Sequence, residues 1–248
     1  MMNDFVKKKV QFKKSINFPC SYIDGNVERR LYINLNNQIN NKDLISSFIK
    51  NGFRRSYDSL YIPICENCNA CISTRINIDK FTFSKRNKRV LKFNKDLFFI
   101  KNTKKKLDER FYLFNEYCSI RHGSSQMAKM SKKEFESFFY KSKNKIEIYD
   151  LSDSKEKIFG SILVDILEDG YSAVYSFFNP FEKKRGLGNL LVLKLISELK
   201  IIGKPYLYLG YWINNSKTMS YKSDFDNIEF FYNGEWVNKS VINSQFYL

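Results

Sequence analysis

Apolar residues recur at every third or fourth position in the middle of the chain, and this spacing predicts two amphipathic helices. The first helix ends near Gly123, because a glycine readily leaves the helical conformation. The second helix opens at Ser131, which forms a capping box with Glu134. The apolar positions of the first helix are Leu107, Phe111, Phe114, Tyr117 and Cys118.

Runs of β-branched and aromatic residues after residue 145 predict strands. The expected strands cover residues 146–151, 158–167, 171–178 and 206–211. Asp169-Gly170 supplies a hairpin turn between the second and the third strand. The segment Arg185-Gly186-Leu187-Gly188 opens a helix that Gly203 ends, between the third and the fourth strand. This alternation predicts a mixed sheet with flanking helices.

The first hundred residues show shorter and less regular elements. Strands at residues 31–35, 60–64 and 72–78 surround a helix at residues 42–51, which Gly52 can end. Because the pattern changes near residue 100, we expect a small cysteine-containing domain at residues 1–100 and a larger domain at residues 101–248. The fold class is α/β (α+β).

Positive charge exceeds negative charge by a wide margin in this 248-residue chain. The 42 Lys and Arg residues, against 26 Asp and Glu, give a formal net charge of +16. Such a charge favours a polyanionic partner, because basic contacts with phosphates release condensed counterions. From Lys80 to Lys106 there are eleven basic residues and one acid, with phenylalanines interleaved as on a nucleic-acid-binding surface. The alternative is compositional drift in a chain rich in Lys, Asn and Ile.

Hydrophobic residues make up 43% of the chain, which is ample for a core. The first residues carry charge without an apolar run before a small-residue cleavage site, and no stretch of 18 residues lacks charges. We therefore expect a cytoplasmic protein with no membrane partner.

Three of the five cysteines form the motif Cys65-x-x-Cys68-x-x-Cys71. An odd number of cysteines without a secretion signal argues against a disulfide framework. Three thiols within seven residues, with Cys20 as a fourth, suit a tetrahedral metal site. The spacing fits both zinc and an iron–sulfur cluster, and the alternative is thiols that pack as small apolar groups. No organic cofactor is expected.

A glycine-containing loop, Lys183-x-x-Gly186-x-Gly188, lies between an expected strand and a long helix. Free amides and the helix dipole at such a place can receive a phosphate, and acetyl-CoA-dependent N-acetyltransferases hold pyrophosphate in this way. Plain turn chemistry is the alternative. The candidate substrate-binding residues of the loop are Lys184, Arg185, Gly186 and Gly188.

Aromatic residues crowd the expected strand from Pro205 to Ile213. Trp212 is a candidate to floor a pocket or to stack on a nucleobase, and the alternative is a buried strand with one aromatic face. Downstream, Met219-Ser220-Tyr221-Lys222 places a cation, Lys222, just after an expected short helix.

Taken together, several segments stand in the order seen in one family. They are Cys20-Ser21-Tyr22 with Glu28-Arg29-Arg30, Gly52-Phe53-Arg54-Arg55-Ser56, Tyr61 to Cys71, Arg75, Ser172 to Pro180, Tyr206 to Ile213 and Met219-Ser220-Tyr221-Lys222. From about residue 15 to residue 237 the chain resembles the bacterial aspartate/glutamate leucyltransferases, relatives of the arginyl-tRNA–protein transferases.

This resemblance implies an acetyltransferase-like (GNAT) C-terminal domain that uses aminoacyl-tRNA, leucyl or arginyl, in place of acetyl-CoA. It also implies acceptor proteins that begin with Asp or Glu and are then degraded by the N-end rule. The sequence departs from the family at two places. Ser73 stands where a proline is common, and the family's Arg-Arg-Ser-Leu-Gly pattern is Lys184-Arg185-Gly186-Leu187-Gly188 here, which leaves the tRNA contacts open.

The aminoacyl ester of a charged tRNA is already activated, so the enzyme must mainly align a neutral amine with the ester carbonyl. An α-amino group has a pKa of about 7.7 to 8.0, so a modest general base suffices. Asp165 is the candidate base, although an acid on an alternating strand can also be solvated. Tyr175 and Tyr211 are candidate donors to the developing oxyanion or to the leaving ribose hydroxyl.

An acidic N-terminal residue calls for cations that pair bidentately, which arginine does better than lysine. Arg54, Arg55 and Arg75 are the candidates, with surface arginines as the alternative. Lys222 could bind the acceptor carboxylate or the tRNA terminus.

Two other functions fit parts of the sequence. An acetyl-CoA-dependent N-acetyltransferase would use the same glycine loop, but it would not need the basic run or the cysteines. A non-catalytic, zinc-containing RNA-binding protein would explain the charge and the cysteines, but not the acyltransferase-like half. The donor amino acid, the acceptor proteins and the oligomeric state are not encoded in any motif that we find.

Overall fold

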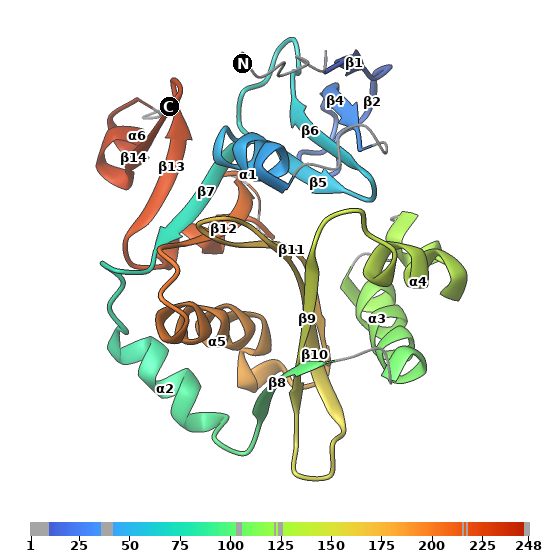
Figure 1. The fold of residues 1–248 in the computed structure, drawn as a ribbon, viewed down its shortest axis with the longest axis vertical. Coiled ribbons are helices and arrows are strands. Elements are labelled where there is room, and N and C mark those ends of the chain that lie inside the picture. Colours follow the sequence, from blue (N-terminus) through green and yellow to red (C-terminus); the bar gives the residue numbers. More distant parts are fainter. Residues whose placement is uncertain are drawn as a thin grey trace, which may run out of the picture.

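The computed structural model describes residues 10–35, 42–102, 106–121, 123, 126–214, 216 and 218–245 of the chain. Within these residues an eight-stranded mixed sheet runs in the order β14-β13-β7-β12-β11-β10-β9-β8 (Figure 1). Only β11 and β12 are parallel neighbours; the other described pairs are antiparallel. The strands are β7 (Ile72–Asn77), β8 (Phe98–Asn102), β9 (Ile146–Ser152), β10 (Ile158–Ile166), β11 (Gly170–Phe178), β12 (Tyr206–Trp212), β13 (Ile228–Tyr232) and β14 (Glu235–Asn238).

Helices cover both faces of this sheet (Figure 1). Helix α5 (Leu187–Ile201) and helix α2 (Lys85–Phe93) lie on one face, and α3 (Leu107–Arg121) and α4 (Lys132–Tyr140) lie on the other. The predicted capping box of Ser131 and Glu134 is present at the start of α4. Short 3-10 helices η2 (Gln126–Lys129), η3 (Lys183–Arg185) and η4 (Ser220–Asp224) and the C-terminal α6 (Lys239–Gln245) complete this part.

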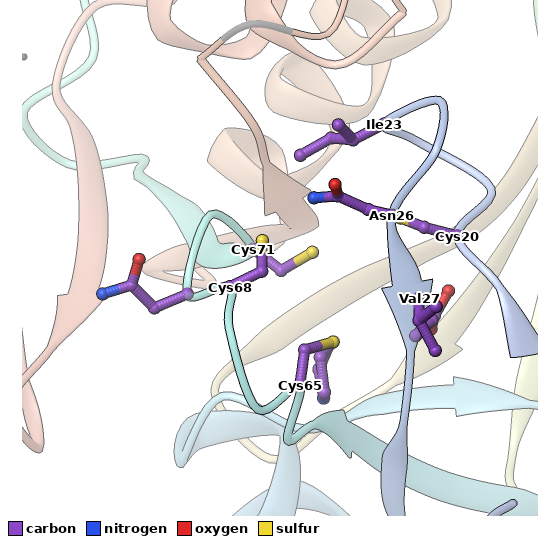
Figure 2. Close-up of a pocket in the computed structure, with 10 residues that line it drawn as sticks. Cys20, Ile23, Asn26, Val27, Cys65, Cys68 and Cys71 are labelled. Carbon is purple, nitrogen blue, oxygen red and sulfur yellow. The ribbon is translucent and has the colours of Figure 1, made fainter. Parts of the chain in front are cut away.

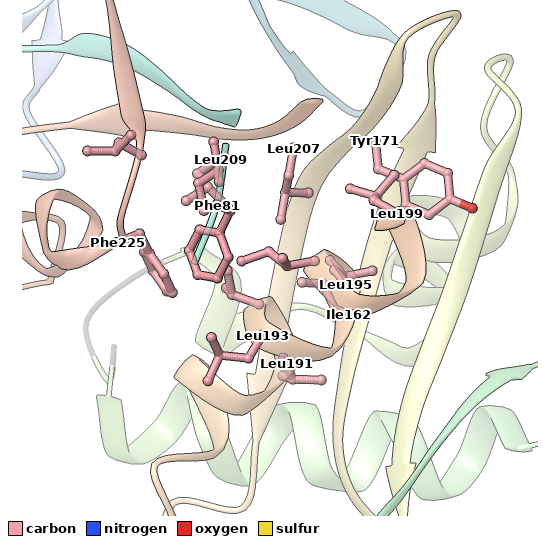
Figure 3. Packing of buried hydrophobic residues seen from close by; sticks show 14 of the residues in the cluster. Phe81, Ile162, Tyr171, Leu191, Leu193, Leu195, Leu199, Leu207, Leu209 and Phe225 are labelled. Carbon is pink, nitrogen blue, oxygen red and sulfur yellow. The ribbon is translucent and has the colours of Figure 1, made fainter. Parts of the chain in front are cut away.

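Two apolar layers follow from the alternation of side chains along the central strands. On β10, Ile162 and Val164 point to the layer with α5, whereas Leu163 points to the layer with α3 and α4. Helix α5 is apolar nearly all round and lies deep in the first layer, where Leu191 and Leu195 pack near Phe81 and Leu207 (Figure 3). Phenylalanines dominate the second layer: Phe114, Phe135, Phe138, Phe139 and Phe177.

A smaller sheet at the N-terminal end runs in the order β1-β4-β6-β5. Its strands are β1 (Lys13–Lys14), β4 (Arg30–Asn34), β5 (Arg54–Ser56) and β6 (Ser59–Pro63), with α1 (Lys42–Lys50) against it and a separate pair of β2 (Phe18–Pro19) and β3 (Val27–Glu28). Tyr208 of β12 and Leu167, which follows β10, join the apolar cluster of this region, so the two sheets share a core.

The mixed sheet with flanking helices that the sequence predicts is confirmed. The helices and strands predicted from apolar periodicity occur within two residues of their expected bounds. Helix α2 and strand β8, inside the basic run, were not predicted, and neither were β13 and β14. The division into residues 1–100 and 101–248 stays a prediction, and β7 and β8, which precede residue 101, are strands of the eight-stranded sheet. In the described residues, no helix has the length and apolar character needed to span a bilayer.

Candidate active site

The central feature of the site is a split between the parallel strands β11 and β12. The two strands are paired only from Gly170 to Ser172 on β11 and from Tyr206 to Tyr208 on β12. Beyond Ser172 the strands diverge, while β12 continues to pair with β7 as far as Trp212. The diverging strands leave backbone carbonyls and amides without ladder partners, which makes the split a place for other groups to bind.

Arg54 of β5 fills the base of this split with its guanidinium group. Nη1 donates to the carbonyl of Leu209 on β12 at 3.0 Å, and Nη2 donates to the carbonyls of Ala173 and Val174 on β11, both at 3.3 Å. The guanidinium occupies the space of a side chain at Gly210, whose built Cβ would lie 0.8 Å from Nη1. Gly210 also has a φ of +75°, in the left-handed region that glycine tolerates. Arg54 therefore bridges the two arms of the split.

A cavity of about 500 Å³ opens from the split between α3, the start of α5 and η4. Its lining mixes backbone and aromatic surface with a few polar groups, which is typical of a ligand site. Four residues predicted from the sequence line it: Tyr175, Gly186, Gly188 and Lys222. The cavity is also lined by residues that were not proposed as site residues from the sequence, although Lys183 and Tyr221 belong to motifs named there: Tyr117, Arg121, Asn179, Lys183, Asn189 and Tyr221.

The first turn of α5 forms one wall of this cavity. Gly186 is the N-cap, with a φ of +61°, and no described side chain caps the helix. The first amides of a helix have no partner within the helix and carry the positive end of its dipole, so they can receive an anion. Gly188 packs against Phe178, whose ring lies 2.9 Å from where a Cβ would stand. The loop thus starts α5 at the wall of the cavity, and its predicted role in binding a phosphate stays a prediction.

Lys222 enters the cavity from η4 with a side chain that is almost fully buried. Its Nζ donates to the carbonyl of Tyr211 and to Sδ of Met219, and no described carboxylate forms an ion pair with it. Burial, and then the guanidinium of Arg54, hold the pKa of Lys222 well below the usual value for lysine. A neutral amine has two N–H groups and one lone pair. The two hydrogen bonds that Nζ donates use both N–H groups and leave the lone pair available.

Two tyrosines, Tyr117 and Tyr175, also line the cavity. The hydroxyl of Tyr175 lies 3.6 Å from the sulfur of Cys118, and burial raises its pKa above the usual value for tyrosine. Burial likewise raises the pKa of Tyr117 to about 12. Both groups therefore stay protonated at neutral pH and can donate hydrogen bonds.

Two of the predicted residues, Asp165 and Arg55, bind each other away from the cavity. Nε of Arg55 donates to both carboxylate oxygens of Asp165 at 2.8 Å, and both side chains are buried. Burial raises the pKa of Asp165, and the charge of Arg55 opposes that rise. The pair links β5 to β10, and neither residue lines the cavity. The roles predicted for both stay predictions.

Four further predicted residues also lie outside the cavity lining. Arg75 pairs with Glu229 at 2.7 Å. Arg185 donates to Asn94 at 2.7 Å and is also ion-paired with Asp96, which ties η3 to the end of α2. The remaining two are Lys184, which is exposed, and Trp212, which is buried with Nε1 donating to the carbonyl of Ser220 at 3.3 Å.

Tyr211 is buried between the two sheets. Its hydroxyl donates to the carbonyls of Tyr61, at 3.1 Å, and Gly52, at 3.4 Å. Burial raises its pKa well above the usual value. Its predicted role as a donor to the substrate stays a prediction, because the hydroxyl does not line the cavity.

The four cysteines predicted to bind a metal line one small pocket (Figure 2). Cys20 follows β2, and Cys65, Cys68 and Cys71 lie between β6 and β7. Across the described residues, no three His, Cys, Asp or Glu donors are placed to hold one ion. Burial is the main cause that raises the pKa of Cys71 to about 12, so its thiol is protonated when no cation is near. The buried carboxylate of Glu28 lines the same pocket, and its Oε2 has no hydrogen-bond partner among the described residues.

Two family models match this chain. The family described as "Arginine-tRNA-protein transferase, C terminus" matches residues 109–232, and "Arginine-tRNA-protein transferase, N terminus" matches residues 18–89. The chain belongs to the arginine-tRNA-protein transferase family. It is an aminoacyltransferase, and the enzyme class predicted from the sequence is confirmed.

Relatives in this family are similar over most of their length. An aspartate/glutamate leucyltransferase of Granulibacter bethesdensis is 34% identical over 88% of this chain and 81% of its own. One of Teredinibacter turnerae is 36% identical over 90% of this chain and 91% of its own. The solved structure of FemX has a TM-score of 0.50 at 8% identity, over 85% of this chain and 82% of FemX, which shows a likeness of fold alone. The relatives give no support to the acetyl-CoA alternative.

Proposed function

We propose that this enzyme transfers leucine from leucyl-tRNA to the N-terminal Asp or Glu of acceptor proteins, which are then degraded. The cavity in the β11–β12 split carries the proposal, because it combines a phosphate-receiving helix start with buried polar groups. The relatives' names support leucine as the donor amino acid, and the name of the family keeps arginine as the other candidate. We place the reaction in the cytoplasm, where charged tRNA is found.

The reaction is the aminolysis of an ester. The acceptor nitrogen attacks the carbonyl carbon, a C–N bond forms, and the C–O bond to the ribose breaks. The proton lost by the amine ends on the ribose oxygen. Because the ester is already activated, alignment in the cavity supplies much of the acceleration.

Lys222 is the group best placed in the cavity to accept the proton of the amine. Its two hydrogen bonds leave the lone pair of the neutral form available, and its burial favours that form. Asp165 remains a candidate from the sequence, but its carboxylate is bound by Arg55. Tyr175, which lines the same cavity, would donate to the leaving ribose oxygen.

The side chain of the acceptor's N-terminal Asp or Glu needs an accessible cation. Arg121, at the end of α3, lines the cavity and is exposed. It is a better candidate than Arg54, Arg55 or Arg75, whose guanidinium groups are bonded to backbone carbonyls or to carboxylates. Amides at the start of α5 would bind a phosphate of the 3′ end of the tRNA.

The cysteine pocket would hold a zinc ion or an iron–sulfur cluster on Cys20, Cys65, Cys68 and Cys71. The thiolate donor set and the shared pocket support this proposal, although binding requires the side chains to turn toward one ion. The group would stabilise the region between β2 and β7, since the two cysteine-bearing segments are far apart in sequence.

A transfer assay tests the proposed function. Purified enzyme is mixed with total tRNA charged with labelled leucine or arginine, and with peptides that begin with Asp, Glu or Ala. We expect RNase-sensitive label on the Asp and Glu peptides alone, and the labelled amino acid names the donor. Acetylation of the peptides from acetyl-CoA, without transfer from either tRNA, would refute the proposal.

A further inference from the structure

Helix α2 carries a row of cations that the fold does not use. Lys85, Lys88, Arg89 and Lys92 follow the i, i+3, i+4, i+7 spacing, so they share one face of the helix. All four side chains are exposed, and none forms an ion pair with another described residue. Helix α2 contains no acidic residue and buries no side chain fully.

Such a row costs the folded protein free energy. Like charges at i, i+4 on a helix destabilise it by about 0.2–0.5 kcal/mol per pair. The helix packs on α5 through the half-buried Val90 and Leu91 instead, on another face from the cations. The cations are therefore free to bind a partner outside the fold.

Helix α2, which carries the row on another face, adjoins the edge of the candidate active site. A small hollow between α2, α5 and η4 is lined by Arg86 and Asn87, and also by Asn189 and Tyr221. Asn189 and Tyr221 line the large cavity as well, so the hollow and the cavity adjoin. Arg86 is held at this edge by Asp224 of η4, at 3.3 Å.

We propose that the face of α2 formed by Lys85, Lys88, Arg89 and Lys92 binds the phosphate backbone of the acceptor stem of the tRNA whose 3′ end enters the cavity. This inference rests on the proposed function, because an ester bound in the cavity forces the attached stem to leave over a neighbouring surface. Phosphates attract a row of cations without regard to base sequence. An acceptor peptide is recognised by one acidic side chain, which cannot pair with four cations spread along a helix.

The test compares two quadruple variants with the same change in charge. One removes the row on α2: Lys85→Gln, Lys88→Gln, Arg89→Gln and Lys92→Gln. The control removes four exposed lysines that form no ion pair with described residues and lie elsewhere: Lys133→Gln, Lys143→Gln, Lys145→Gln and Lys155→Gln. Glutamine has nearly the helix propensity of lysine and arginine, so neither variant should unfold.

Each variant is assayed with two donors, the full charged tRNA and the same amino acid esterified to adenosine, which has no stem. We expect the KM of the α2 variant for charged tRNA to be roughly tenfold higher or more. The slope of log affinity against log salt concentration should become shallower by about two or more. Its KM for aminoacyl-adenosine and its KM for the acceptor peptide should equal those of the wild type. The control should match the wild type with both donors.

Three outcomes would overturn the inference. In the first, the two quadruple variants behave alike. In the second, the α2 variant loses activity equally with both donors. In the third, only its KM for the acceptor peptide rises, which would assign the row to an acidic peptide. If the wild type uses neither donor, the proposed function fails, and fluorescence anisotropy with labelled tRNA then still tests the surface.

Discussion

The bridge of Arg54 across the β11–β12 split can be broken by adding one methyl group. In the substitution Gly210→Ala, the new Cβ would stand 0.8 Å from Nη1 of Arg54, and the guanidinium must leave its place. Arg54→Ala removes the same three hydrogen bonds directly.

The cost of Gly210→Ala has two parts. The left-handed backbone costs an alanine about 1–2 kcal/mol. Each hydrogen bond of a charged donor is worth about 1.5–3 kcal/mol, and we take the lower end, with one or two bonds lost, because Arg54 is only half-buried. We therefore expect the free energy of unfolding to fall by about 2.5–5 kcal/mol.

Gly203→Ala is the matched control. Gly203 has a φ of +66°, and a Cβ built there has no atom within 4 Å, so this substitution costs the backbone term alone, about 1–2 kcal/mol. Urea denaturation of both variants, and of Gly210→Ala in the Arg54→Ala background, measures the terms separately. In that background Gly210→Ala should cost no more than Gly203→Ala.

Equal destabilisation by Gly210→Ala and Gly203→Ala in the otherwise wild-type chain would refute this reasoning. Strictly additive effects of Gly210→Ala and Arg54→Ala on the free energy of unfolding would also refute it, because both substitutions remove the same hydrogen bonds of Arg54. The transfer rate of folded Gly210→Ala should also fall, since the split that it distorts forms the floor of the cavity.

Three further predictions concern single side chains. Lys222→Met should lower the transfer rate but raise the stability at neutral pH. Because the pKa of Lys222 is lowered in the folded protein, the unfolded chain binds more protons below the usual lysine pKa, so the stability of the wild type rises with pH and urea denaturation across pH should show a flatter profile for the variant. A less stable variant with the wild-type dependence on pH would contradict this. Asp165→Asn leaves Arg55 buried without its counter-ion and should cost about 3–5 kcal/mol of stability. The kcat of folded Asp165→Asn should change less than the roughly 10²–10⁴-fold expected for loss of a general base, and a larger loss would restore Asp165 to that role. Cys68→Ser should lower the zinc or iron content of the purified protein, measured by elemental analysis, and an unchanged content would refute the metal site.

Local pattern predicted most of the fold. The apolar spacing of α3 and α5, the capping box at Ser131 and the glycine stop at Gly203 are all decided by residues close in sequence. Helix α2 was missed because only Val90, Leu91 and Phe93 of its nine residues are apolar, too few to show a helical period. The pairing of β7 with β12 and β13 was equally invisible, because register between distant strands leaves no local signal.

The candidate site was harder to predict than the fold. The glycine loop and Lys222 were found because a motif marks them, and both line the cavity. Arg54, Arg55 and Arg75 were chosen because a guanidinium can pair with a carboxylate. Whether it is available to a substrate depends on its burial and on its partners in the fold. Sequence alone could not place Arg54 in the split or join Arg55 to Asp165, since each contact spans more than a hundred residues.

The position of β7 also has a consequence for synthesis on the ribosome. Its partners on β12 and β13 lie about 130 residues or more downstream, so β7 leaves the exit tunnel long before either neighbour exists. At ~5–20 residues per second the wait lasts roughly 6 to 26 s. During that time its apolar residues, Ile72 and Ile76, cannot reach their final places in the core. The eight-stranded sheet must therefore remain unfinished until the chain is nearly complete, although the strands of the small N-terminal sheet can already pair with one another.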